Sequence, residues 1–137
     1  MMLYLDNAAT TLKKPLSVYA TLFKSTLFSG GNAGRGGHKM SMDAVRAIVD
    51  TQDLIAQLFN IKKAENIVFT QNATYALNTA ILGTMSNGGH IVVTEMDHNS
   101  VLRPACLPGN YTVVKADKSG YVHAEDVEKA VRKDTKL

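Results

Sequence analysis

The sequence predicts an α/β fold in which helices flank a mostly parallel sheet. Residues 67–69 are β-branched or aromatic, as in a short buried strand, and residues 73–81 place apolar side chains at helical spacing. A second strand-like run follows at residues 90–94, after an Asn-Gly-Gly turn. The order strand, helix, strand is typical of two parallel strands joined by a right-handed crossover.

The composition indicates a single domain. With 137 residues, of which 45% are hydrophobic and 20% charged, the chain is long enough to bury a core. The net charge of +3 comes from scattered Lys and Arg, which gives no footprint for nucleic acid. No apolar run approaches the roughly 20 residues that cross a bilayer, and Asp6 and Asn7 lie where a signal peptide would be apolar. We therefore expect a cytoplasmic protein with no nucleic-acid or membrane partner.

A strand and a helix are predicted at the N-terminus. Residues 3–5 are typical of a short strand that ends in a polar turn at residues 6–11. Pro15 suits the first turn of a helix that continues to about Leu27. The apolar stripe of this helix is expected to pack in the core and comprises Val18, Tyr19, Leu22 and Phe23.

Residues 29–38, SGGNAGRGGH, form a glycine-rich segment whose backbone can approach another surface closely. The Gly-Lys-Ser/Thr ending of a P-loop is missing, so a nucleotide-binding loop is not favoured. The composition also suits a flexible linker, and that alternative stays open. Arg35 and His38 add a cation and an imidazole, which suit a loop that closes over an anionic ligand.

The next helix is predicted at residues 44–59, with Ser41 as its N-cap. Its buried side is expected to comprise Val45, Ile48, Val49, Leu54, Ile55 and Leu58. A charged turn at residues 62–65 then leads to the central strand.

The C-terminal part continues the alternation of helices and strands. The sequence predicts a short helix at residues 101–105, a third strand at 111–114 and a turn at 117–120. A helix is predicted at residues 123–133, and residues 135–137 lie where a fourth strand would start.

The turn from strand to helix at residues 70–74 is a candidate phosphate site. It places unpaired N–H groups at the positive end of the helix dipole, and Thr74 adds a hydroxyl donor. A purely structural interpretation is also open, because Asn72 or Thr74 could simply cap the helix. His98 follows the second strand, at the sheet edge where Thr74 is also expected. That position makes His98 a candidate catalytic residue.

Four motifs, in this order, resemble the class V aminotransferases, specifically the cysteine desulfurases and selenocysteine lyases. They are YLDNAATT at 4–11, SGGNAGRGGHKMS at 29–41, NIVFTQNATYALN at 66–78 and VTEMDHNSVLRP at 93–104. The whole chain resembles the N-terminal part of such an enzyme. The resemblance implies a three-layer fold that is part of the large domain of the fold type I pyridoxal-phosphate (PLP) enzymes, truncated before the Schiff-base lysine.

The resemblance also implies roles for individual residues. The N–H groups of Ala73 and Thr74 and the Thr74 hydroxyl would bind the cofactor phosphate, next to Asn72. His98 matches the histidine that stacks on the pyridine ring and takes part in proton transfers. Residues that resemble the surroundings of the substrate pocket and the dimer interface are Asn7, Ala8, Arg35 and His38.

In this family a lysine joins the cofactor, and a cysteine takes the substrate sulfur as a persulfide and leaves alanine. The sequence departs from that pattern, because neither residue has a match within residues 1–137. Lys39 follows a histidine but lies in the wrong motif, and Cys106 comes too early to carry sulfur. We expect Cys106 to be a small buried thiol. Tyr75 stands where the family usually has an acidic residue.

The resemblance thus implies a PLP-dependent cysteine desulfurase, present here as an N-terminal portion that is inactive alone. Its expected partners are an amino-acid substrate, a second copy in a homodimer and a sulfur-acceptor protein, and no metal site is expected. Two alternatives stay open. One is another class V activity, such as transamination or selenocysteine cleavage, and the other is a non-catalytic module that binds a phosphate compound or a partner protein.

Overall fold

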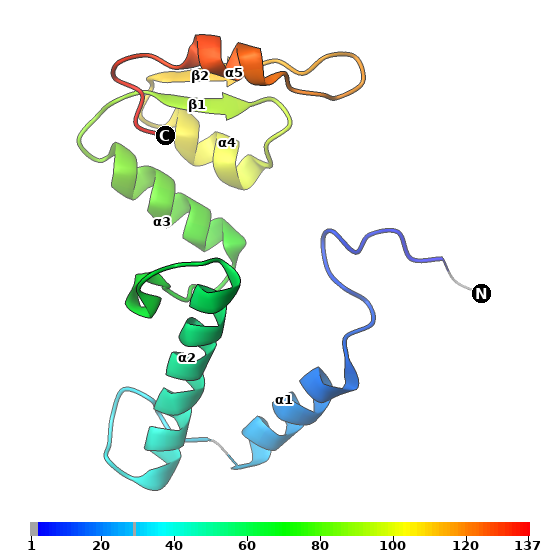
Figure 1. Ribbon diagram of the computed structural model, residues 1–137, viewed down its shortest axis with the longest axis vertical. Helices are drawn as coiled ribbons and strands as arrows, with labels where there is room; N and C mark the ends of the chain where they lie inside the picture. Colours follow the sequence, from blue (N-terminus) through cyan, green and yellow to red (C-terminus); the bar gives the residue numbers. More distant parts are fainter. Residues whose placement is uncertain (1–2, 29) are drawn as a thin grey trace. The chain divides into compact units, whose positions relative to one another are not determined.

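The computed structural model describes residues 3–28 and 30–137, and the chain divides into two compact units after Val68. The first unit contains helices α1 (Leu16–Phe28) and α2 (Lys39–Leu58) and the 3-10 helix η1 (Ala64–Asn66). The second unit contains, in chain order, α3 (Ala73–Met85), β1 (Ile91–Thr94), α4 (Asn99–Cys106), β2 (Tyr111–Val114) and α5 (Ala124–Ala130) (Figure 1). None of these helices is both long enough and apolar enough to span a membrane, as far as the described residues show.

The strand predicted at residues 3–5 is wrong. This segment has irregular backbone, and Leu3 and Leu5 are 80% and 83% exposed. The Tyr4 hydroxyl lies 2.8 Å from the Thr10 carbonyl oxygen and so closes the polar turn that follows. A strand is stabilised by a neighbour, and residues 3–5 have no β-partner among the described residues.

Helix α1 confirms the predicted helix and begins directly after Pro15. The prediction that its apolar stripe packs in the core is wrong, because no residue described in α1 is buried and Phe23 remains 69% exposed. Helical spacing shows which side chains share a face, but it does not show what covers that face.

Helix α2 begins earlier than predicted, and its N-cap is His38 rather than Ser41. The His38 Nδ1 atom accepts a hydrogen bond from the Ser41 N–H (3.4 Å). Ser41 lies inside the helix and is fully buried, and its hydroxyl donates to the Asn32 carbonyl. Gly31 lies so close to the Met40 backbone that a Cβ atom would overlap it. The predicted close approach of the glycine-rich backbone is therefore confirmed.

Most of the predicted buried side of α2 is exposed, which corrects the sequence interpretation. Val45 and Ile55 are half-buried, whereas the buried residues of this helix are Ser41 and Ala56. The predicted core residues that are exposed are Ile48, Val49, Leu54 and Leu58.

No strand forms at residues 67–69, where the sequence predicts the central one. Ile67 has extended backbone angles, φ −93° and ψ 118°. Its carbonyl, however, accepts a hydrogen bond from the Gln52 side chain (2.8 Å) rather than from a neighbouring strand. The local preference is correct, but no described residue supplies the β-partner that a ladder needs.

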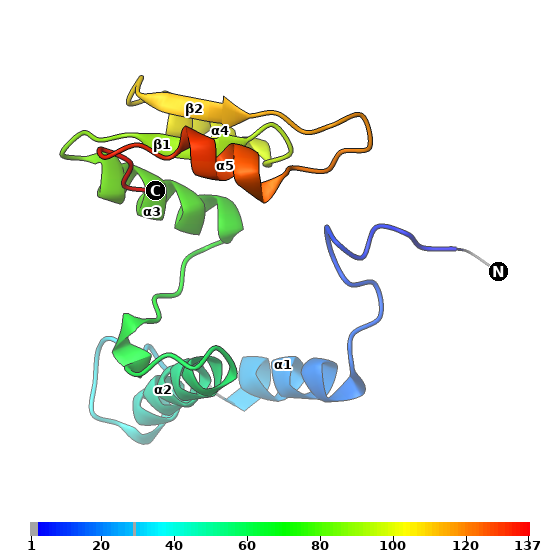
Figure 2. The same ribbon diagram turned by 45° about the horizontal axis from the view of Figure 1, so that its top comes forward.

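Strands β1 and β2 confirm the predicted parallel sheet. They pair in register from Ile91 opposite Tyr111 to Thr94 opposite Val114, and α4 lies between them in the chain (Figure 2). Helix α4 packs against β1 and α5 packs against β2, on opposite faces of the strand pair. The second unit is therefore a three-layer α/β arrangement, as predicted.

The C-terminal residues pair with the other edge of β1, as predicted for the start of a further strand. His90 forms a parallel bridge with Thr135, and the Lys136 N–H donates to the His90 carbonyl (2.8 Å). This pairing also explains why α5 ends at Ala130 rather than at residue 133. The chain leaves the helix in order to turn back toward β1.

The core of the second unit is formed by α3, α4 and β1. Its buried residues are Ile81, Met85, Ile91, Val93 and Ala105. The two buried residues of β1 are two positions apart, so they lie on the same face of the strand. The two buried residues of α3 are four positions apart, so they lie on one side of the helix. This core fixes α3 against α4 and thereby sets the positions of the residues at their N-termini.

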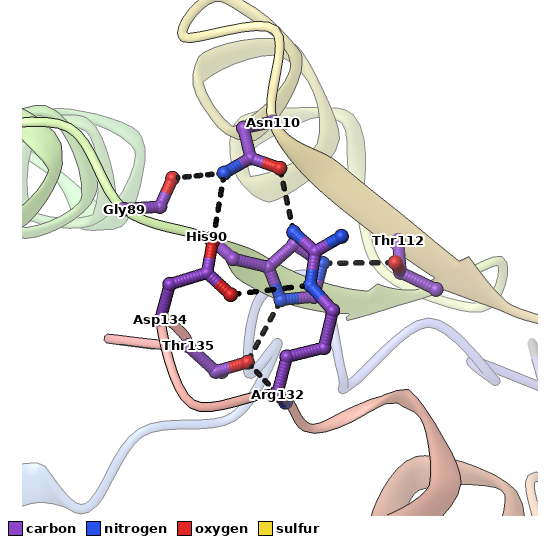
Figure 3. Close-up of polar contacts among 7 residues, drawn as sticks. All are labelled: Gly89, His90, Asn110, Thr112, Arg132, Asp134 and Thr135. Carbon is purple, nitrogen blue, oxygen red and sulfur yellow. Dashed lines mark hydrogen bonds and ion pairs between the residues drawn. The ribbon is translucent and has the colours of Figure 1, made fainter.

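A polar network joins the strands to the C-terminal residues (Figure 3). The imidazole of His90 is fully buried, with Nδ1 2.8 Å from the Thr135 hydroxyl and Nε2 2.8 Å from the Thr112 hydroxyl. Beside it, the Arg132 guanidinium donates to the Asn110 side-chain oxygen (2.6 Å). The network therefore connects β1, β2 and the segment after α5 through side chains as well as through backbone.

The turn after β2 gives a prediction for pH dependence. Asp117 accepts hydrogen bonds from the Ser119 hydroxyl (2.6 Å), the Tyr121 N–H (3.0 Å) and the Ser119 N–H (2.8 Å), and these hold the pKa of Asp117 at about 2, below its usual 3.8. Because the folded pKa is depressed, this carboxylate stabilises the turn fully above pH 3.8 and progressively less as the pH falls toward 2. Carboxyl NMR titration is expected to show this depressed midpoint.

Ser119→Ala is the matched variant for that titration. It removes the largest single cause of the shift and should move the Asp117 midpoint upward toward its usual value. An unchanged midpoint in the variant would contradict this account of the turn.

Candidate functional site

The N-terminus of α3 presents two unpaired backbone donors. The Asn72 side chain accepts a hydrogen bond from the Tyr75 N–H (2.8 Å), and the Asn72 carbonyl accepts one from Ala76 (3.1 Å). Asn72 is thus the N-cap, which was the structural alternative for this residue. The N–H groups of Ala73 and Thr74 have no acceptor among the described residues. They lie at the positive end of a 13-residue helix.

The turn between β1 and α4 fixes the position of His98. The Asp97 carboxylate accepts hydrogen bonds from the N–H (2.7 Å) and the hydroxyl (3.1 Å) of Thr94, which closes the turn. His98 is the N-cap of α4, because its Nδ1 accepts a hydrogen bond from the Ser100 N–H (3.2 Å). Since Nδ1 is an acceptor here, the neutral ring carries its proton on Nε2. The exposed side of the imidazole therefore offers a donor.

Thr74 and His98 line one pocket of about 310 Å³, together with Asn78, Asn99, Ser100, Arg103 and Pro104. The prediction that these two residues share a cleft is confirmed. The predicted reason was adjacent strand ends, but residues 67–69 form no strand. Packing of α3 on α4 brings the two helix starts together instead.

Asn78 is a site residue that the sequence analysis missed. Pro104 lies inside α4 and has no N–H, so the Ser100 carbonyl four residues earlier lacks its helical partner. The Asn78 side-chain amide donates to that carbonyl (3.3 Å) and to the Thr74 carbonyl (2.9 Å). Asn78 therefore ties the two helices together at the pocket. A proline five residues after the first residue of the helix was the signal that an outside donor was needed.

The charges around this pocket favour an anion. The residues that line it include Arg103, which carries a positive charge, but neither Asp nor Glu. The N-terminal ends of α3 and α4, at Thr74 and Asn99, both lie at the pocket and add the positive ends of two helix dipoles. Arg103 was not predicted as a site residue, although it lies in a motif that the family resemblance covers.

The other predicted site residues lie in the first unit. The Asn7 side chain accepts a hydrogen bond from the Leu12 N–H (3.4 Å), and Ala8 belongs to the same exposed turn. Arg35 is exposed on the glycine-rich loop, and the His38 imidazole caps α2. For these four residues a role at the substrate pocket or the dimer interface stays a prediction.

The prediction that Cys106 is a buried thiol is wrong. Cys106 is the last residue of α4 and is exposed, because the helix ends at the surface there. A hydrogen bond with Cys106 raises the pKa of Tyr111.

Lys39 lies in the first turn of α2, where its ammonium group contacts Asp43 (2.7 Å) and lowers the pKa of that carboxyl.

Fold and pocket together define a three-layer α/β protein with an anion-favouring pocket at the starts of two helices. A sequence profile described as aminotransferase class-V matches residues 3–137. The chain belongs to the class-V aminotransferase family, whose enzymes depend on PLP. The predicted family is therefore confirmed.

Curated relatives narrow the comparison to cysteine desulfurases. A probable cysteine desulfurase of Aeropyrum pernix is 39% identical over 74% of this chain and 25% of the relative. The cysteine desulfurase IscS of Dictyoglomus turgidum is 34% identical over 98% of this chain and 35% of the relative. The chain thus spans about a quarter to a third of the length of these relatives.

Solved structures confirm the fold. A NifS-like protein matches with a TM-score of 0.85 and 25% identity, over 98% of this chain and 38% of that one. A structure titled SspA in complex with cysteine matches with a TM-score of 0.76 and 24% identity, over 88% of this chain and 37% of that one. The predicted α/β fold, as part of the larger fold of these enzymes, is therefore confirmed.

Proposed function

We propose that this chain is the N-terminal, cofactor-binding portion of a PLP-dependent cysteine desulfurase. The full-length enzyme would convert L-cysteine to L-alanine and pass the sulfur to one of its own cysteines. The observation that carries the proposal is the single pocket lined by both Thr74 and His98. The names of the curated relatives favour cysteine as the substrate over the other class V activities.

The α3 terminus suits the phosphate of PLP. The N–H groups of Ala73 and Thr74 and the Thr74 hydroxyl have no partners among the described residues and can donate three hydrogen bonds. Asn72 belongs to this site because its side chain caps α3 and fixes the turn. No carboxylate lines the pocket to repel an anion. These residues therefore fit the group that the family requires.

His98 is positioned both to stack on the cofactor ring and to transfer a proton. Its Nδ1 is held by the Ser100 N–H, so the ring plane is fixed at the start of α4. The ring would stack on the pyridine of PLP, and Nε2 would donate and recover a proton near the reacting atoms. When bound, PLP supplies the electron sink for cleavage of the carbon–sulfur bond.

Two residues of this chain are assigned no part in covalent chemistry. Lys39 is engaged with Asp43, and Cys106 lies at the opposite end of α4 from His98, about 12 Å along an eight-residue helix. We propose that a different lysine joins the cofactor and a different cysteine takes the sulfur. The homodimer, the sulfur-acceptor protein and the roles of Asn7, Ala8, Arg35 and His38 belong to the same proposal.

Two measurements test this function. The full-length enzyme is expected to acquire a PLP absorption band and to release alanine and sulfide from cysteine. After borohydride reduction, mass spectrometry should find the pyridoxyl group on a lysine other than Lys39. Absence of the band and of both products would refute the function, whereas reduction at Lys39 would refute the lysine assignment alone.

A further inference from the structure

Arg103 lies where it can contact a ligand bound in the pocket. It follows Asn99 by four residues on α4, so the two share one side of the helix, and both line the pocket that Thr74 and His98 also line. Arg103 is not among the residues to which the family resemblance gives a role.

The positive charge of Arg103 is uncompensated in the described part of the molecule. Within that part, Arg46 lies 3.7 Å from Asp43 and Arg132 lies 3.3 Å from Asp134, whereas no carboxylate lies within ion-pairing distance of Arg103. The side chain of Arg103 is exposed on the pocket side of α4 rather than packed into the core. A guanidinium group in this position attracts an anion that enters the pocket.

On the basis of the proposed function, we propose that Arg103 is a binding residue for the phosphate of PLP. The α3 terminus offers about half a unit of positive charge, whereas a phosphate monoester carries nearly two negative charges. A planar guanidinium group with parallel N–H donors can supply the missing charge and bind two phosphate oxygens at once. Arg103 and Thr74 would then hold the phosphate from two helices, which fixes the pyridine ring beside His98.

The test measures cofactor affinity in the full-length enzyme rather than activity alone. Arg103→Gln is expected to weaken PLP binding at least about tenfold, because it removes the charge and the paired donors. Pyridoxal, which lacks the phosphate, should bind the variant and the unchanged enzyme equally. The ³¹P resonance of bound PLP should shift in the variant, and Arg103→Lys should fall between the two.

Arg46→Gln is the matched control, since Arg46 is exposed on α2 and is assigned no role in the site. It should leave PLP affinity unchanged. Equal PLP affinity in Arg103→Gln and the unchanged enzyme would overturn the inference, as would an equal loss for PLP and pyridoxal. A raised KM for cysteine with unaltered PLP affinity would place Arg103 on the substrate carboxylate and also overturn it. Failure of the unchanged enzyme to bind PLP would instead refute the proposed function.

Discussion

Replacing His98 by asparagine is expected to slow the release of sulfur from cysteine by a factor on the order of 100 to 10,000 in the full-length enzyme. The imidazole supplies both the proton donor and the stacking surface in the proposed mechanism. Asparagine removes these but remains a good N-cap, so α4 should still begin at Asn99. Steady-state rates with cysteine, together with a thermal melt, separate the chemical effect from a structural one.

His98→Ala and His123→Asn complete that comparison. The alanine variant loses the cap as well as the ring, and it should therefore melt lower than His98→Asn by an amount equivalent to about 1 kcal/mol. His123 is exposed near the start of α5, and its replacement should leave the rate unchanged. A rate for His98→Asn within about threefold of the unchanged enzyme would exclude His98 from proton transfer.

Local sequence signals were sufficient where the partner of each element lies close by in the chain. The strands at residues 91–94 and 111–114 and the helix from Ala73 match the prediction, because β1, β2 and α3 pack mainly on one another and on α4. The buried residues of β1 are two positions apart and those of α3 are four positions apart, and both pairs belong to one core.

The first unit shows that local sequence signals do not predict which residues are buried. The apolar spacing of α1 and the β-branched residues before Phe69 are real local preferences, yet Leu22 is 64% exposed and Val68 78% exposed. Burial depends on a second surface, and periodicity in one segment carries no information about that surface. The sequence therefore predicted the elements of this unit better than it predicted their packing.

The residues of the candidate site also divide into those that local sequence patterns predict and those that depend on tertiary packing. Thr74 and His98 could be predicted because each follows from a local rule, a helix start and a strand end. Asn78 and Arg103 could not, since Asn78 donates from one helix to the other and Arg103 comes to share a pocket with Thr74 only through the packing of the two helices. Asn78 matters because of the carbonyl that Pro104 leaves unpaired, and that relation becomes visible only once α3 and α4 are packed together.

Replacing His90 by alanine is expected to destabilise the second unit by about 3 kcal/mol. The substitution leaves a cavity at a fully buried position, removes the side-chain partner of the Thr112 hydroxyl and leaves the Thr135 hydroxyl with only the Arg132 N–H (Figure 3). Urea unfolding of the 137-residue chain should show the loss. The N–H group of Lys136, which donates to the His90 carbonyl, should exchange with solvent faster in the variant.

Substitutions at other positions separate the effect of the cavity on stability from the effect of the lost hydrogen bonds. Thr135→Val keeps the volume but removes one hydroxyl, so it should cost about 1 kcal/mol and speed exchange at Lys136. His123→Ala changes an exposed histidine and should stay within about 0.5 kcal/mol of the unchanged chain. If His90→Ala were no more destabilising than His123→Ala, the network would not hold the C-terminal residues. Parallel pairing at the edge of β1 would then depend on backbone hydrogen bonds alone.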